Sequence, residues 1–259
     1  MKNKEDFAIL ITNKSVTVTT DGNSKTVRKE DASYGDLIRA IKNQQWDKIS
    51  RLLSPEDAVL DLSNGQMSVI DSQVTLKTSN GDFLVPSGLN DKILLHIEKK
   101  LPFEPLIKFA LNLSENPSKH SVDQLFTFLE ANHFAITDSG NFIAYKKVRA
   151  DFKDVRTGTM DNSIGLTVSM PRDQVCSNAE VHCSIGLHVA NYNYAHNIYN
   201  GDITLLVEVN PKNVVSVPND YDCAKMRVCE YRVLSLAKEE LKDHLYKDGP
   251  FDDTNVIID

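Results

Sequence analysis

Four side chains that could bind a metal or act in catalysis lie close together in the sequence: Cys176, His182, Cys183 and His188. Zinc prefers Cys and His ligands, but structural zinc sites usually present two close ligand pairs separated by a spacer. The spacing here does not follow that pattern, and neighbouring side chains such as His182 and Cys183 point to opposite sides of a strand. We therefore expect thiols and imidazoles without a bound metal.

His188 is the strongest single candidate for chemistry. It follows Gly186-Leu187 and precedes a tyrosine-rich stretch, so we expect it at the end of a strand beside aromatic and polar groups. Such a position suits a catalytic or ligand-binding residue. The alternative, which we favour, is a histidine that is hydrogen-bonded into the sheet, because no nucleophile accompanies it. Ser184 does not lie in a Gly-x-Ser-x-Gly motif, and the chain has no glycine-rich phosphate loop.

The elements that must position these residues are short β-prone segments bounded by turn residues, as in a compact β-rich domain. We place this domain at residues 140–235, because the hydrophobic period changes from 3.6 to 2 near Gly140. Its expected strands cover residues 141–149, 166–170, 183–190, 203–209, 214–218 and 224–233. Residues 151–165 are expected to form a long loop or irregular hairpin, and residues 190–199 a short helix.

The N-terminal part, residues 1–139, combines two small meanders with amphipathic helices. Strands are expected at residues 7–10, 16–19, 25–27, 67–70, 74–77 and 83–85, and helices after Ser33, Ser87, Phe103 and Ser118. Residues 236–259 are expected to form a helix, from Lys238 to Tyr246, and an acidic tail. The sequence therefore predicts an α+β protein with a helical and small-sheet N-terminal half. No low-complexity linker separates the halves, so we expect them to pack together.

Composition excludes several classes of function. The net charge is −7, with no strongly basic zone, which disfavours a protein that binds nucleic acid directly through phosphate contacts. No apolar run approaches the roughly 20 residues that a membrane-spanning helix needs. No export signal is visible, so the four cysteines are expected to be reduced thiols in a cytosol.

Several ordered motifs resemble the phage rIIB family. They are residues 86–89 (PSGL), 115–118 (ENPS), 142–149 (FIAYKKVR), 161–165 (DNSIG), 170–172 (MPR), 183–189 (CSIGLHV), 210–218 (NPKNVVSVP) and 225–231 (KMRVCEY). The resemblance implies an accessory protein of a tailed phage that influences lysis timing and protects the infection against prophage-encoded exclusion. It also implies a larger partner, rIIA, and a place in the host cytoplasm, peripheral to the inner membrane. No cofactor is expected on this interpretation.

Two alternatives remain open. Residues 186–190 (GLHVA), 205–209 and 229–233 (CEYRV) are similar in order to the motifs of ADP-ribosyltransferases, which have a split sheet. That similarity would make Tyr145, His188 and Glu230 the candidate catalytic residues and NAD the cofactor, or leave an inactive nucleotide-binding domain. The other alternative is a structural component of the virion.

Tyr192, Tyr194 and Tyr199 are candidates for contact with a partner protein, because exposed tyrosines are favoured at interfaces. The alternative is that two of the three pack against the sheet beside His188.

Overall fold

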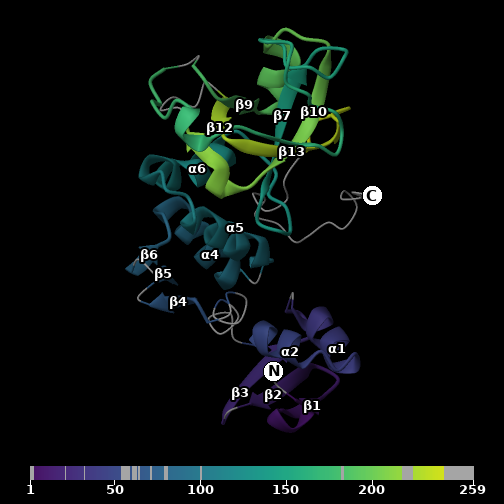
Figure 1. Cartoon of the computed structure of the whole chain (residues 1–259). Coiled ribbons are helices and arrows are strands. Elements are labelled where there is room, and N and C mark those ends of the chain that lie inside the picture. The colour runs from purple at the N-terminus through teal and green to yellow at the C-terminus, as the bar shows by residue number, and fades with distance from the viewer. Residues whose placement is uncertain are drawn as a thin grey trace.

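The computed structural model describes residues 3–20, 22–31, 33–53, 59, 63, 65–70, 72–78, 81–99, 101–181, 184–217 and 224–241. It confirms an α+β protein with a helical and small-sheet N-terminal half and a larger C-terminal sheet. In Figure 1 the chain rises from a small N-terminal unit, through a helical layer, to that C-terminal sheet. None of the described helices is long and apolar enough to cross a bilayer.

The N-terminal unit is a three-stranded antiparallel sheet covered by two helices. After the short 3-10 helix η1 (Lys4–Asp6) come β1 (Ala8–Ile11), β2 (Ser15–Thr20) and β3 (Asn23–Arg28), and then α1 (Tyr34–Lys42) and α2 (Trp46–Leu53). Alternate residues of β2 point inward, and Val16 and Val18 are fully buried. Trp46 stacks on Phe7 with ring centroids 5.8 Å apart. This unit has its own hydrophobic core, separate from the main one.

A second meander leads into three helices. Its strands are β4 (Met67–Ile70), β5 (Gln73–Thr78) and β6 (Gly81–Leu84), and the helices are α4 (Ser87–Glu98), α5 (Glu104–Ser114) and α6 (Lys119–Ala131). The Ser118 side chain caps α6 by accepting a hydrogen bond from the Ser121 N–H. The apolar face of α6 is buried as its spacing predicts, with Phe126 against Phe109 of α5.

The C-terminal sheet has seven strands in the order β11-β12-β9-β7-β10-β13-β8, and its strand pairs are antiparallel. The strands are β7 (Phe142–Val148), β8 (Thr167–Ser169), β9 (Leu187–Ala190), β10 (Ile203–Val209), β11 (Val214–Ser216), β12 (Lys225–Val228) and β13 (Glu230–Leu236). Short helices η2 (Arg172–Gln174), η3 (Tyr194–Ile198) and η4 (Pro211–Asn213) lie between them. β7 pairs with β10 along its whole length, but with β9 only at Tyr145 and Ala190.

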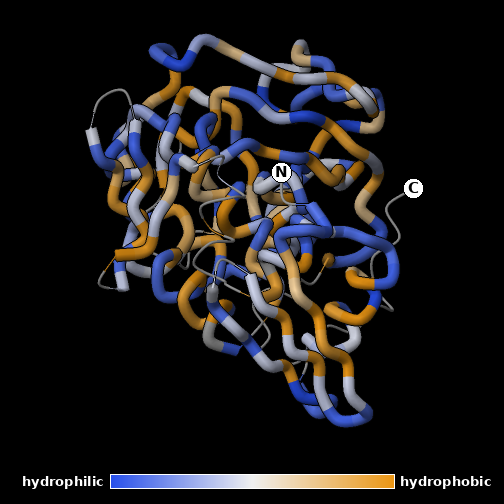
Figure 2. Tube along the Cα trace, turned by 90° about the horizontal axis from the view of Figure 1, so that it is seen from below, coloured by the Kyte–Doolittle hydropathy of each residue, from blue (hydrophilic) through white to orange (hydrophobic). Residues whose placement is uncertain are grey.

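One hydrophobic core joins the helical layer to this sheet. Phe134, which follows α6, packs edge-on against Phe142 of β7 with ring centroids 6.0 Å apart. Gly140 lies between them at φ 75°, where a Cβ atom would come within 2.4 Å of the α5 backbone, so only glycine fits. Figure 2 shows hydrophobic stretches running through the interior and hydrophilic residues gathered at the outer turns. The helical layer and the C-terminal sheet therefore pack together. The division of the chain at 1–139, 140–235 and 236–259 remains a prediction.

Three of the sequence motifs meet in a polar link between the helices and the sheet. The buried Asn116 side-chain amide donates to the carbonyl oxygens of Pro211 and Val214, each at 2.8 Å. The Arg172 guanidinium donates to Asn116 Oδ1 at 2.8 Å and to the Lys212 carbonyl at 2.7 Å. These motif residues therefore hold the fold together, since their polar groups bond to one another at the junction.

Two expected helices differ from the sequence prediction. Residues 190–199 do not form an ordinary helix: β9 extends to Ala190, and η3 is a π-type turn. Asn191 Oδ1 accepts from the Tyr194 N–H at 2.9 Å and so caps that turn. Residues 238–241 have no helical structure, and the rest of the expected C-terminal helix and the acidic tail lie outside the described residues.

Candidate functional site

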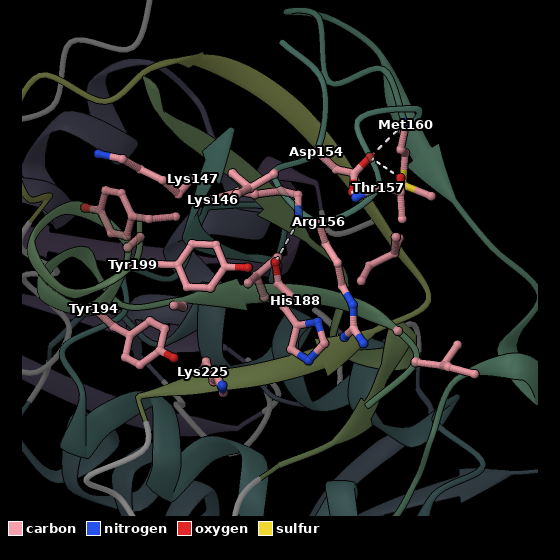
Figure 3. Close-up of a pocket in the computed structure, with 18 of the residues that line it drawn as sticks. Lys146, Lys147, Asp154, Arg156, Thr157, Met160, His188, Tyr194, Tyr199 and Lys225 are labelled. Carbon is pink, nitrogen blue, oxygen red and sulfur yellow. Dashed lines mark hydrogen bonds between the residues drawn. The ribbon is translucent and has the colours of Figure 1, made fainter. Parts of the chain in front are cut away.

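A cavity of about 350 Å³ lies where β7 and β9 diverge. Its walls come from β7, β9, η3, the start of β12 and the loop between β7 and β8. Charged and polar lining residues are Lys146, Lys147, Asp154, Arg156, Thr157, His188, Tyr194, Tyr199 and Lys225. We call this space the basic cavity, because among the described residues that line it four are lysine or arginine and only Asp154 is acidic. Figure 3 shows these side chains.

Lys146 lies at the point of divergence. Its ammonium donates to the carbonyl oxygen of His188 at 3.0 Å and sits 5.4 Å from the centroid of the Tyr231 ring. Burial lowers the pKa of Lys146 to about 8, and the charge of Asp154 opposes that shift. Within the described residues Lys146 forms no ion pair with a carboxylate. It therefore carries a positive charge at neutral pH on a half-buried side chain, and this charge is only partly compensated.

His188 presents its imidazole to the same cavity. Its Nε2 atom is buried and has no hydrogen-bond partner, whereas a hydrogen bond with the Gly186 backbone supports the protonated ring. Burial, and then the charges of Lys146, Lys225 and Arg227, lower the pKa of His188 to about 4. The imidazole is therefore neutral at pH 7, and one of its ring nitrogens is left to meet a ligand.

The loop between β7 and β8 contributes Asp154 and Arg156, and it forms the irregular hairpin expected there, with bridges from Val148 to Asp154 and from Lys153 to Asp161. The Asp154 carboxylate accepts hydrogen bonds from Thr157 Oγ1 at 2.6 Å and from the N–H groups of Thr157, Thr159 and Met160 at 2.7, 3.1 and 2.9 Å. Burial alone would raise its pKa, but these bonds lower the pKa to about 2. Asp154 is therefore ionised, and its hydrogen bonds fix the conformation of the loop.

Of the three candidate tyrosines, Tyr192 packs against neighbouring rings, whereas Tyr194 and Tyr199 line the basic cavity. Tyr192 is half-buried, with its ring 5.2 Å from Tyr145 and stacked on His196 at 4.8 Å. Tyr194 and Tyr199 stack on each other at 6.3 Å and both line the basic cavity. The Lys225 ammonium lies 5.3 Å from the centroid of Tyr194. Tyr199 is 43% exposed, so it remains the tyrosine best placed for a partner.

The three residues of the ADP-ribosyltransferase alternative do not meet. Tyr145 and His188 border one cavity, but Glu230 is not among its lining residues. Glu230 lies on β13, where it pairs with Ser169 of β8 and accepts a hydrogen bond from the Asn213 amide at 3.1 Å. The Tyr145 hydroxyl accepts from the Leu241 N–H at 2.6 Å, and burial raises the pKa of Tyr145 to about 12. The structure does not confirm the ADP-ribosyltransferase-like strand order.

The cysteine and histidine cluster gives no metal centre among the residues that the structure describes, where no group of three or more His, Cys, Asp or Glu side chains could hold an ion. His182 and Cys183 lie outside those residues, as does Cys223. Cys176 and Cys229 are free thiols. The Arg227 guanidinium donates to the carbonyl oxygens of Cys176, Asn178 and Val181, so the segment before β9 is tied to β12.

Sequence reasoning missed Lys146, Arg156 and Lys225 as members of one site. Only Lys146 has a signal in the sequence. It stands on the strand face that carries Phe142, Ala144 and Val148 into the main core, where a lysine is unexpected. Arg156 and Lys225 lie in a loop and at a strand start, where basic residues are ordinary.

Taken together, the fold and the basic cavity define a class: an α+β protein whose C-terminal sheet opens around a positively charged pocket. A family model described as Bacteriophage T4 protein rIIB matches residues 1–242. Protein rIIB of Enterobacteria phage T4 is 32% identical over 241 residues, which cover 92% of this chain and 76% of that protein. No solved structure matches the chain. The chain belongs to the rIIB family of bacteriophage proteins.

Proposed function

We propose that this protein is a phage accessory protein that modulates the timing of lysis and protects the infection against exclusion by the host or a prophage. It acts through contact with a larger rIIA-like protein of the same phage, in the host cytoplasm and peripheral to the inner membrane. The observation that supports this proposal is the family match over residues 1–242, together with 32% identity to protein rIIB of phage T4.

The surface that we assign to the partner lies beside the mouth of the basic cavity. Ile198 and Tyr199, at the end of η3, are 61% and 43% exposed. An exposed aliphatic side chain next to an exposed tyrosine is the composition favoured at the centre of protein interfaces. Tyr192 and Tyr194 contribute by holding the turn, because both pack into the small cluster around Tyr145 and Ala195.

Co-purification with the rIIA-like protein from infected cells tests this surface. We expect Tyr199→Ala to weaken the complex by more than about tenfold, or 1.4 kcal/mol. Leu84→Ala is the matched control, because Leu84 is 62% exposed on a distant sheet. Deletion of residues 249–259 should leave the complex intact. A complex that survives Tyr199→Ala but is lost with the tail deletion would place the interface elsewhere.

The effect on infection is tested by timing lysis with a phage that lacks the gene, complemented by each variant. The wild-type protein should restore the lysis time and growth on an excluding lysogen, and Tyr199→Ala should restore neither. If no complex with an rIIA-like protein forms and the protein co-purifies with virions at the stoichiometry of a structural subunit, the virion alternative replaces the proposal.

A further inference from the structure

Among the described residues that line it, the basic cavity has four lysine or arginine side chains and one carboxylate. Lys146 reaches the space from the core face of β7 and finds a carbonyl oxygen and an aromatic face as its contacts. An ammonium group has three donors, and a charge removed from water is costly unless it is paired. The geometry around Lys146 therefore suits an additional acceptor with negative charge.

Asp154 does not supply this acceptor for the Lys146 ammonium. Four hydrogen bonds from its own loop already occupy the Asp154 carboxylate, including both oxygens. Its charge acts on Lys146 only at a distance, since no ion pair joins them. The acidic residue thus shapes the loop that carries Arg156, while Lys146 and Arg156 form no ion pair among the described residues.

Further donors converge on the same space. Figure 3 shows Arg156 extending from its loop toward the His188 side of the cavity, while Lys147 points away from it. Within the described part of the chain Arg156 forms no ion pair. The ammonium of Lys225 lies on β12, and His188, whose Nε2 acceptor is unpaired among the described residues, lies on the neighbouring strand β9. Several donors around one small volume are typical of sites for oxyanions such as phosphate.

The rest of the wall suits a flat, partly apolar group. Tyr194 and Tyr199 supply aromatic rings, and Val155, Met160, Met170 and Ile185 supply apolar surface. At about 350 Å³ the cavity is larger than a phosphate ion needs and falls at the lower end of the range for small-molecule sites. Aromatic rings beside cations are the combination that binds the bases and phosphates of nucleotides.

We propose that the basic cavity is a nucleotide-binding site, in which Lys146, Arg156 and Lys225 hold the phosphate and Tyr194 and Tyr199 contact the base. The neutral ring of His188 accepts a further hydrogen bond at Nε2 from a hydroxyl group of the nucleotide. The site binds without a glycine-rich loop, because side chains rather than backbone N–H groups surround the phosphate. This inference goes beyond the proposed function and does not depend on the partner.

Isothermal titration of the full-length protein with AMP, GMP, CMP, UMP and NAD⁺ tests the proposal, with the corresponding nucleosides and inorganic phosphate as reference probes. We expect at least one of the nucleotides to bind with a Kd below about 1 mM. The matching nucleoside and inorganic phosphate should each bind at least about tenfold more weakly. Absence of binding by all five nucleotides, or equal binding of inorganic phosphate, would overturn the proposal.

Three variants locate the binding. Lys146→Met should abolish it while preserving the fold, because an apolar side chain of similar length replaces a shielded charge. Arg156→Ala should weaken it by at least about tenfold, and this exposed loop residue can be changed without disturbing the core. Arg232→Ala is the matched control, since Arg232 is exposed on β13 of the same sheet, outside the cavity. Binding that survives both Lys146→Met and Arg156→Ala would place the nucleotide elsewhere.

An NMR readout separates the cavity from the rest of the surface. The His188 imidazole resonances, identified by their absence in His188→Gln, should shift on addition of the nucleotide and remain unshifted in Lys146→Met. If the wild-type protein binds no nucleotide but still co-purifies with the rIIA-like protein, this inference alone is contradicted. If the wild-type protein binds a nucleotide but forms no complex with the rIIA-like protein, only the proposed function is contradicted.

Discussion

The side chain of Lys146 bonds to the backbone of His188, with its ammonium 3.0 Å from the carbonyl oxygen. The bond forms beside the single position, Tyr145 opposite Ala190, at which β7 pairs with β9. A side chain thus joins two strands that diverge too far for a continuous backbone ladder. The consequence is a cavity between the diverging strands β7 and β9, with the positive charge of Lys146 at the point where they separate.

Replacing Lys146 by Met should stabilise the unliganded protein. The Lys146 side chain is half-buried, and its ammonium has no carboxylate partner among the described residues. Exchanging such a charge for an apolar group is often stabilising, here by about 1 kcal/mol or more. Urea unfolding at pH 7 measures the change. Lys212→Met is the control, because Lys212 pairs with Glu115 at the surface and contributes at most about 1 kcal/mol. A loss of stability in Lys146→Met would contradict this prediction.

The stabilising effect of Lys146→Met should depend on pH. The pKa of Lys146 is about 8 in the folded protein and 10.5 in an unperturbed lysine, so the unfolded chain binds more protons between these values. The unfolding free energy of the wild-type protein should therefore rise relative to that of Lys146→Met as the pH increases from about 8 toward 10.5. Unfolding measurements on both proteins across this range test the effect, and a constant difference would exclude it.

His188 should remain neutral well into the acidic range. Burial, followed by the nearby charges, lowers its pKa from 6.5 to about 4. The unfolded chain then binds more protons between these values, so stability is lost as the pH falls from 6.5 to about 4. NMR titration of the imidazole, assigned with His188→Gln, gives the pKa directly. A midpoint near 6.5 would show that the ring is solvated and that the cavity is open at this side.

Phe126 should be a major contributor to the main core. It is 1% exposed, and its ring lies 5.9 Å from that of Phe109 in an edge-to-face arrangement. Truncation to Ala should cost about 3–5 kcal/mol of unfolding free energy. Leu84→Ala, at an exposed position, should change it by no more than about 0.5 kcal/mol. A cost below about 1 kcal/mol for Phe126→Ala would mean that the helix face is not packed.

The cysteines should all titrate as thiols in unreduced, denatured protein, giving four per chain. In the native protein Cys176 should be labelled before Cys229. Hydrogen bonds from Ser184 and the Asn178 backbone, with the charge of Arg227, lower the pKa of Cys176, whereas Cys229 is buried. Peptide mapping after brief alkylation tests the order. Two or fewer thiols, or earlier labelling of Cys229, would contradict these expectations.

Much of the fold could be predicted from the sequence, because hydrophobic period reports which face of an element is buried. The strand around Val16 and Val18 alternates, and the helix that carries Phe126 repeats at helical spacing. Both patterns depend on residues that are near neighbours in the chain. The ordered motifs likewise indicate the rIIB family, because each of them is a short run of consecutive residues.

The turn at residues 194–198 could not be predicted in this way. The tyrosine-rich stretch suggested an ordinary helix over residues 190–199, but Tyr194–Ile198 form a π-type turn. The Tyr199 N–H instead bonds to the Tyr194 carbonyl at 2.9 Å, and Asn191 caps the turn. Local propensity does not distinguish such a π-type turn from an ordinary helical one.

By itself the sequence determined the α+β class, the family and the place of His188 at a strand near tyrosines. Only the tertiary structure decided that Lys146, Arg156 and Lys225 share a cavity with His188 and that Glu230 does not. The reason is the strand order, which places β9 between β7 and β12 although these strands are far apart along the chain. Local pattern shows which residues are buried, but the pairing of distant strands determines which of their charges meet.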